Sequence, residues 1–177
     1  MNFEALETQR LLLRRFQPQD WQMVHEYMSS PAVTAYLPEG QFSQDQAREL
    51  VTEGGSDFDE SIAVMLKEEN ALIGHMIFHP WFAQHTYEIG WVLHTRYHNQ
   101  GFATEAAIAL LKYGFEKMKL HRIIATCQPE NIPSVRVMEK LGLRREGYFQ
   151  KCIHLGDDRW WDEYFYAMLE EDWFKAA

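Results

Sequence analysis

One stretch of the chain, residues 87–118, limits the possible fold more than any other. It reads YEIGWVLHTRYHNQGFATEAAIALLKYGFEKM. In its first part, apolar residues alternate with residues such as Glu88 and Gly90, which is typical of a strand with two different faces. After the polar segment 96–101, small and apolar residues recur at helical spacing: Ala103, Ala107, Leu110, Leu111, Gly114 and Met118. The stretch therefore predicts a strand, a short loop and a long amphipathic helix.

The predicted junction between this loop and the helix is typical of an anion-binding site. The free N–H groups of the first helical turn and the positive end of the helix dipole both point at the loop. A glycine before a helix is also ordinary punctuation, so an ordinary turn is the alternative interpretation. The sequence contains no G-x-x-x-x-G-K-[ST], and no G-x-G-x-x-G follows the strand, which excludes two better-known phosphate loops.

The rest of the chain predicts further elements around this stretch. Strands are expected at 8–16 (as an edge strand), 61–66, 71–82, 122–127, 144–153 and 160–169. Helices are expected at 18–28, at 44–53 and after Asn131, whereas 29–42 is expected to be a loop. Ser43 and Gln46 predict a capping box for the helix that Gly54 and Gly55 end. Gly74, inside a strand pattern, predicts a bulge or a close backbone approach.

Several segments carry a resemblance to a known family. YEIGWVL with YHNQGFATEA, the later PENIPSVRVMEKLGLRREG, and the flanking ETQRLLLRRFQPQDW and WWDEYFYAML resemble the GNAT superfamily of N-acetyltransferases. More narrowly they resemble its RimJ/RimL-type branch, which includes ribosomal-protein-alanine N-acetyltransferases. The phosphate loop of this family is usually Q/R-x-x-G-x-G/A. Here Gly101 and Ala103 keep that spacing, but His98 stands where Gln or Arg is usual. The backbone of the loop is therefore expected to cradle the phosphate as in the family, and a side-chain contribution from His98 is left open.

The resemblance implies an α+β fold of the GNAT type. It implies three layers, α/β/α, around a mixed and mostly antiparallel sheet of about seven strands with a parallel, splayed central pair. The order of the predicted elements agrees with this fold, and 177 residues suit a single domain, 1–177.

Composition limits the partners of the chain. A net charge of −9 argues against a nucleic-acid surface and is compatible with a cationic amine substrate, although solubility alone explains it equally well. The chain shows no secretory signal and no run of about 18 apolar residues, so a cytoplasmic location without a membrane partner is expected. Cys127 and Cys152 could pair, but in such a chain they are expected to stay reduced.

The resemblance implies acetyl-CoA as cosubstrate, held largely by backbone groups. The backbone of Trp91, Val92 and Leu93 is expected to pair with the pantetheine arm where the central strands splay. A sheet in which these strands pair throughout is the alternative. The remaining expected coenzyme-binding residues are those of the loop, the first helical turn and a later helix start: His98, Asn99, Gln100, Gly101, Phe102, Ala103, Thr104 and Asn131.

Direct acetyl transfer to an amine needs a base, a stabilised oxyanion and a route for the leaving thiolate. Glu88, beside Gly90, is predicted to be the base or to position a water, with a structural carboxylate as the alternative. Ser134 is the candidate partner of the leaving sulfur, or else it only supports the cap of its helix. No tyrosine lies between residues 122 and 147, so Tyr148 and Tyr164 are the fallback acids.

The acceptor pocket is predicted least well. Tyr36 and Trp161 are proposed to contact the substrate, and Trp21 and Phe42 are further candidates, although aromatic residues in such positions are more often plain core. The histidines do not form an H-x-x-x-H on a helix, so no metal is expected. Cys127 is expected to be a buried structural thiol and not a nucleophile.

The predicted function is N-acetyltransfer from acetyl-CoA to a primary amine by direct transfer. The acceptor is either a protein N-terminal α-amino group or a small amine, and the chain is a monomer or a homodimer. The alternative from another class is a non-catalytic acyl-CoA-binding regulatory module.

Overall fold

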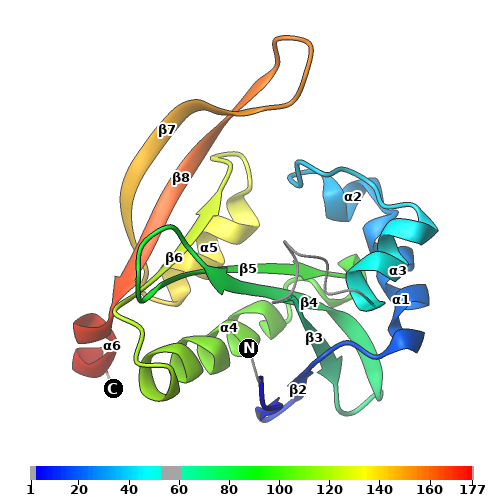
Figure 1. Cartoon of the computed structure of the whole chain (residues 1–177), viewed down its shortest axis with the longest axis horizontal. Coiled ribbons are helices and arrows are strands. Elements are labelled where there is room, and N and C mark those ends of the chain that lie inside the picture. Colours follow the sequence, from blue (N-terminus) through cyan, green and yellow to red (C-terminus); the bar gives the residue numbers. More distant parts are fainter. Residues whose placement is uncertain (1–2, 53–60, 177) are drawn as a thin grey trace. The chain divides into compact units, whose positions relative to one another are not determined.

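The computed structural model describes residues 3–52 and 61–176. Within them the chain forms one mixed sheet of eight strands in the order β1-β2-β3-β4-β5-β6-β8-β7 (Figure 1). The strands are β1 (Leu6–Glu7), β2 (Leu11–Arg14), β3 (Ser61–Leu66), β4 (Ala71–Pro80), β5 (Thr86–Leu93), β6 (Arg122–Cys127), β7 (Arg144–His154) and β8 (Trp160–Leu169). The helices are α1 (Trp21–Met28), α2 (Pro31–Thr34), α3 (Gln44–Thr52), α4 (Phe102–Lys112), α5 (Ile132–Lys140) and α6 (Glu170–Ala176).

The predicted α+β fold with a parallel central pair is confirmed. β5 and β6 run parallel, and their ladder joins Thr86 to Arg122 and Glu88 to Ile124 at its two ends. The pairs β2–β3, β3–β4, β6–β8 and β7–β8 are antiparallel. The ladder between β5 and β6 therefore covers the first three residues of each strand, while β5 continues to Leu93 and β6 to Cys127.

Two predictions near the start of the chain were wrong. A single edge strand was expected at 8–16, but the chain reverses there, because Thr8 N donates to Leu11 O at 2.9 Å and Leu11 N donates to Thr8 Oγ1 at 2.9 Å. The short β1 therefore lies outside β2 in the sheet. The expected loop 29–42 contains α2, a single turn in which the carbonyl oxygen of Ser30 accepts from Val33 N and Thr34 N.

The predicted cap of α3 was more reliable than these strand and loop predictions. Ser43 N donates to Gln46 Oε1 at 2.9 Å, and Gln46 N donates to Ser43 Oγ at 3.3 Å, so the predicted capping box opens α3. The predicted stop at Gly54 and Gly55 lies outside the described residues. At the other end of the chain, α6 had no counterpart among the predictions, and β4 ends at Pro80, two residues earlier than expected.

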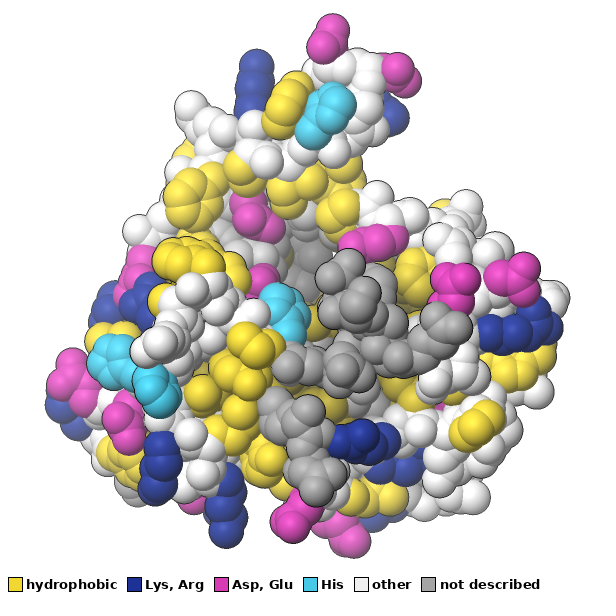
Figure 2. Space-filling view, viewed as in Figure 1, with side chains coloured by type: hydrophobic (Ala, Val, Ile, Leu, Met, Phe, Trp, Pro, Cys, Tyr) yellow, Lys and Arg dark blue, Asp and Glu magenta, His cyan; other side chains and the backbone are white. Residues whose placement is uncertain are grey.

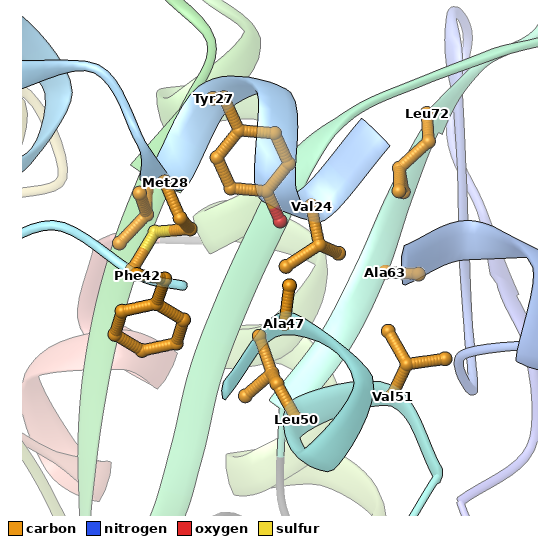
Figure 3. Packing of buried hydrophobic residues seen from close by; sticks show 10 residues of the cluster. Val24, Tyr27, Met28, Phe42, Ala47, Leu50, Val51, Ala63 and Leu72 are labelled. Carbon is orange, nitrogen blue, oxygen red and sulfur yellow. The ribbon is translucent and has the colours of Figure 1, made fainter. Parts of the chain in front are cut away.

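By its internal contacts the chain divides into two compact units. The first comprises Met1–His79 and Gly90–Leu110, and the second comprises Pro80–Ile89 and Leu111–Ala177. In the first unit, α1 and α3 pack their apolar sides against strand residues (Figure 3). The buried cluster consists of Val24, Tyr27, Met28, Phe42, Ala47, Leu50, Val51, Ala63, Leu72 and Val92.

The second unit contains the β7–β8 hairpin, drawn in orange and red in Figure 1. Its buried cluster on one face of β6 and β8 consists of Ile124, Phe165 and Ala167, and Trp81 packs against them. The pairing of Ile124 with Ala167 and of Thr126 with Phe165 puts these side chains on the same face, because directly opposed strand residues point the same way. This face also carries the polar side chains of the candidate active site.

Candidate active site

The end of β5 in the first unit lies against a bulge in β4. The register between β3 and β4 shifts after Val64, which lies opposite Gly74. Gly74 has φ 154°, and a Cβ atom there would lie 2.2 Å from the carbonyl oxygen of Val92 and 2.7 Å from the Cα of Leu93. Only glycine allows this approach, so the predicted bulge and close contact at Gly74 are both confirmed.

In the loop that follows β5, two side chains fold back onto the backbone. Residues 98–104 are the segment predicted to bind the diphosphate, and we call them the phosphate loop. The ring of His98 turns back, and its Nε2 donates to the carbonyl oxygen of Leu93 at 2.9 Å, while the Gln100 side chain donates to the carbonyl oxygen of Arg96. Asn99 and Gly101 have φ values of 59° and 81°, a conformation that suits Asn and Gly. The loop therefore curls tightly before α4 begins at Phe102, whose first-turn N–H groups have no partner within the helix.

A carboxylate holds the phosphate loop to the start of the chain. Glu105 accepts hydrogen bonds from the Thr8 hydroxyl at 2.5 Å, from Arg10 N at 2.9 Å and from Arg10 Nε at 2.7 Å. Arg10 also donates from Nη1 to the carbonyl oxygen of Gln100 at 3.0 Å, and its guanidinium lies 4.3 Å from the centre of the Phe102 ring. Partial burial works to raise the pKa of Glu105, but the hydrogen bonds from Thr8 and Arg10 outweigh it and lower the pKa.

Sequence reasoning missed Arg10 and Glu105 as supports of this loop. Each residue belongs to a locally unremarkable pattern, and 95 positions separate them in the chain. Only the fold brings the turn between β1 and β2 against the first turn of α4, so no local signal could have revealed the pair.

In the second unit, Glu88 is part of a small group of polar side chains. The Thr126 hydroxyl donates to Glu88 Oε1 at 2.9 Å, and it also forms a hydrogen bond with the carboxyl group of Glu163. We call Glu88, Thr126 and Glu163 the carboxylate face. Burial and the nearby charge of Glu88 raise the pKa of Glu163, although the hydrogen bond from Thr126 opposes the rise. Sequence reasoning found Glu88 but missed Thr126 and Glu163, which come from two other strands.

The start of α5 is capped as predicted. Asn131 Oδ1 accepts a hydrogen bond from Ser134 N at 3.3 Å, and the proline of the first turn follows the capping residue. Ser134 therefore takes part in the cap through its backbone. A role for its hydroxyl toward the leaving sulfur stays a prediction, as does the contact of Asn131 with the coenzyme.

The fallback acid Tyr148 is exposed and lies in β7 of the β7–β8 hairpin. At the tip of this hairpin, at the top of Figure 2, acidic, basic, histidine and hydrophobic side chains lie together. Its hydroxyl donates to Asp162, which also accepts from Lys151 N at 2.8 Å. This bond to Asp162 raises the pKa of Tyr148 to about 12 and lowers that of Asp162. The centres of the Tyr148 and Tyr164 rings lie 5.5 Å apart, so the two fallback acids are neighbours.

The aromatic residues proposed for the acceptor pocket have different environments. Phe42 belongs to the buried core of the first unit, so the core interpretation is correct for it. Trp21 packs partly against that core, with the Arg48 guanidinium 4.0 Å from its ring centre. Tyr36, also in the first unit, and Trp161, in β8, are each half-buried. Their contact with a substrate stays a prediction.

The two cysteines are free, Cys127 buried and Cys152 exposed. Across residues 3–52 and 61–176, no group of three or more His, Cys, Asp or Glu side chains is arranged to hold a metal ion. A search of the same residues found no helix with the length and apolar character needed to cross a membrane.

Residues 10–144 match the family described as the acetyltransferase (GNAT) domain. The chain therefore belongs to the GNAT acetyltransferase family. Over 95% of its length it is 55% identical to the uncharacterized N-acetyltransferase YnaD of Bacillus subtilis (strain 168), of which it covers 98%. A crystal structure of a GNAT-family acetyltransferase from Bacillus anthracis, also 55% identical, superposes with a TM-score of 0.89 and covers 95% of this chain and 99% of that one. The chain is thus an N-acetyltransferase.

A more distant relative supports the branch suggested by the sequence. The [ribosomal protein uS5]-alanine N-acetyltransferase of Escherichia coli (strain K12) is 29% identical over 89 residues, which are 50% of this chain and 45% of that protein. This similarity agrees with a RimJ/RimL-like branch.

Proposed function

We propose that this enzyme moves an acetyl group directly from acetyl-CoA to a primary amine, with Glu88 as the base. The observation that carries the proposal is the hydrogen bond of 2.9 Å from Thr126 to Glu88. It fixes a carboxylate on β5, the strand that continues through residues 91–93 into the phosphate loop. Family membership supports acetyl-CoA as the donor.

The coenzyme is proposed to bind mainly through the backbone. The diphosphate accepts hydrogen bonds from N–H groups of the phosphate loop, where the helix dipole of α4 adds a favourable field. The pantetheine arm follows the backbone of Trp91, Val92 and Leu93, and Asn131 contributes a further contact. His98 is proposed to support the loop from behind through its bond to Leu93 and not to touch the phosphates.

The reaction removes two protons from the acceptor nitrogen and replaces the C–S bond of the thioester with a C–N bond. Glu88, directly or through a water, takes a proton from the ammonium group of the acceptor, and the free amine nitrogen attacks the thioester carbonyl carbon. A backbone N–H near Val92 or Leu93 stabilises the oxyanion. The C–S bond then breaks, and the new amide nitrogen gives up its second proton. The departing sulfur, to which Ser134 is proposed to hydrogen-bond, takes up this proton directly or through water and leaves as the thiol of coenzyme A.

The acceptor is proposed to be a primary amine of one of two kinds. A protein N-terminus is favoured by the similarity to the uS5-alanine N-acetyltransferase. A small amine is favoured by the net charge of −9, which attracts cations. Tyr36 and Trp161 are the proposed contacts in either case, and the chain is proposed to act in the cytoplasm as a monomer or homodimer.

The test is Glu88→Gln, assayed by release of coenzyme A with a panel of N-terminal peptides and small amines. Removal of a general base is expected to lower kcat/KM by about 10²- to 10³-fold. The Kd for coenzyme A is expected to stay unchanged, because Glu88 is not among the proposed coenzyme contacts. Full turnover in Glu88→Gln would contradict the role of this residue. Coenzyme binding without transfer to any amine by the wild type would favour the regulatory acyl-CoA-binding alternative.

A further inference from the structure

Four aromatic side chains of the second unit contact one another in series beside the carboxylate face. The centre of the Phe149 ring, in β7, lies 5.8 Å from that of Phe165 in β8, and the Phe165 ring centre lies 5.2 Å from that of Trp81. Trp81 in turn lies 4.0 Å, centre to centre, from Phe82, in the segment between β4 and β5. We call these four side chains the aromatic row.

The two ends of the aromatic row are exposed, whereas its middle is packed. Phe82 is 84% exposed and Phe149 is 48% exposed, while Phe165 is buried and Trp81 is half-buried. Trp81 and Phe165 pack in the cluster on β6 and β8, so the middle of the row contributes to folding. Single exposed apolar residues are ordinary, but exposed rings that continue one apolar surface are typical of a binding site.

The register of the strands places the aromatic row beside the carboxylate face. Phe165 pairs with Thr126 of β6, and Phe149 pairs with Glu163 of β8. Directly opposed strand residues point to the same side, with Cβ atoms about 5 Å apart, so each of these two polar residues has a ring as its neighbour. The Phe149 ring also lies 3.5 Å from the position that a Cβ atom of Gly147 would take, so the ring lies over a glycine.

The charged groups on this side of the sheet favour a cation. Two carboxyl groups, those of Glu88 and Glu163, lie beside the hydroxyl of the carboxylate face. The guanidinium of Arg122 lies 5.9 Å from the centre of one ring of the row, but it is paired with Glu146. A ligand with an ammonium group at the carboxyl groups and an apolar body along the rings therefore matches both parts of the surface.

We propose that the acceptor is the N-terminus of a peptide whose first few side chains are apolar, and that the aromatic row selects these side chains. This inference rests on the proposed acetylation of amines and names the substrate class. The α-amino group lies at the carboxylate face, the first apolar side chains contact Phe149, and later ones reach Phe82. An extended peptide rises about 3.3 Å per residue, so about five residues can follow the three ring-to-ring steps of 4.0, 5.2 and 5.8 Å. A small amine with a single ring covers only part of the row.

The test compares two peptides of that length with the same charge. Both begin with alanine and have an amidated C-terminus, but one continues with leucine and phenylalanine and the other with serine. In the wild type, kcat/KM is expected to be about tenfold higher for the apolar peptide, mainly through a lower KM, because its side chains leave water on binding.

Removal of either exposed end of the row is expected to weaken this preference. Phe82→Ser and Phe149→Ser should each lower the ratio of kcat/KM between the two peptides by about threefold to fivefold. Phe174→Ser is the matched control, because Phe174 is 51% exposed in α6 of the same unit, and it should leave the ratio as in the wild type. A wild-type ratio near one, or a ratio that neither row variant lowers, would overturn the proposal.

Two further measurements exclude other occupants of the row. Acetylation of phenethylamine, with neither peptide accepted, would assign the row to a small amine and overturn the peptide class. In light scattering, a dimer that Phe82→Ser converts into monomers, with the peptide ratio unchanged, would assign the row to a contact between two copies of the chain and overturn the proposal.

Peptide binding in the presence of coenzyme A, measured by titration calorimetry, separates this inference from the proposed function. The apolar peptide is expected to bind about tenfold more tightly than the polar one, and both row variants should reduce the difference. Acetylation of both peptides with equal kcat/KM and equal Kd would overturn the inference and leave the proposed function intact. Selective binding of the apolar peptide without acetylation of any amine would overturn the proposed function, and the row would remain a peptide-binding surface.

Discussion

The phosphate loop of the first unit and the carboxylate face of the second are built from different groups. In the loop, His98 and Gln100 bond back to the backbone, so what the loop offers a ligand is mainly its N–H groups. On the carboxylate face, the polar groups that meet are the side chains of Glu88, Thr126 and Glu163. A backbone site depends on the path of the chain, whereas a side-chain site depends on which residues meet. The first is therefore sensitive to backbone displacement and the second to chemical identity.

The largest expected effect comes from Gly74→Ala, at the bulge in β4 that lies against the end of β5. The new methyl would lie 2.2 Å from a backbone oxygen at Val92, which cannot move aside as a flexible side chain would. We expect a loss of about 3 kcal/mol in the free energy of unfolding, from overpacking together with an unfavourable φ. Urea denaturation measures it. Gly40→Ala is the matched control, since Gly40 also has a positive φ, 68°, but nothing lies within 4 Å of its Cβ position. Equal losses in the two variants would show that φ, and not the close approach to β5, decides the cost.

The difference between local patterns and contacts across long stretches of the chain explains which features could be predicted from the sequence. The strand of Glu88, the glycine-bearing loop, the Ser43 capping box and the Asn131 cap all follow from patterns within a few residues. The reversal at Thr8 escaped prediction because one side-chain oxygen splits a continuous apolar pattern into two strands. Thr126 lies 38 positions from Glu88, and Arg10 lies 95 from Glu105. Such pairs depend on sheet order and register, which no local pattern contains.

The next largest effect is expected in the pH dependence of the free energy of unfolding, through a buried histidine of the first unit. Burial lowers the pKa of His75, in the core of the first unit, from 6.5 to about 4. As the pH falls below 6.5, the unfolded chain binds a proton at this residue before the folded protein does, so stability falls until about pH 4. We expect His75 alone to remove about 2 kcal/mol between pH 7 and pH 5. His75→Asn, which keeps an amide near the Tyr27 hydroxyl, should flatten that part of the stability curve measured by urea denaturation.

Exposed histidines provide the comparison for this measurement. His121→Asn removes an imidazole that solvent already reaches, and the pH dependence of stability should follow the wild type. A curve for His75→Asn that keeps the full wild-type slope would show that other groups cause the acid loss.

A smaller effect is expected when the support of the phosphate loop is removed. Arg10→Met keeps most of the apolar stem over Phe102 and the backbone bond to Glu105, but loses the side-chain bonds to Glu105 and Gln100. The loop backbone is then less restrained, so we expect the Kd for coenzyme A to rise about tenfold by titration calorimetry. Arg159→Met removes the same charge from an exposed site on the hairpin and should leave the Kd unchanged. Equal weakening in both variants would point to long-range charge instead of loop support.

The smallest expected effect tests the comparison of the two regions most directly, because it changes a side chain in the phosphate loop, which offers mainly its backbone. His98→Gln restores the residue type usual in the family and removes the ring that donates to Leu93 at 2.9 Å. The lost hydrogen bond should lower stability by about 1 kcal/mol. Since the N–H groups of the loop are untouched, the Kd for coenzyme A should change less than about threefold. Binding that becomes tenfold tighter in His98→Gln would show that a side chain at this position can reach the diphosphate. The phosphate loop would then depend on chemical identity as the carboxylate face does.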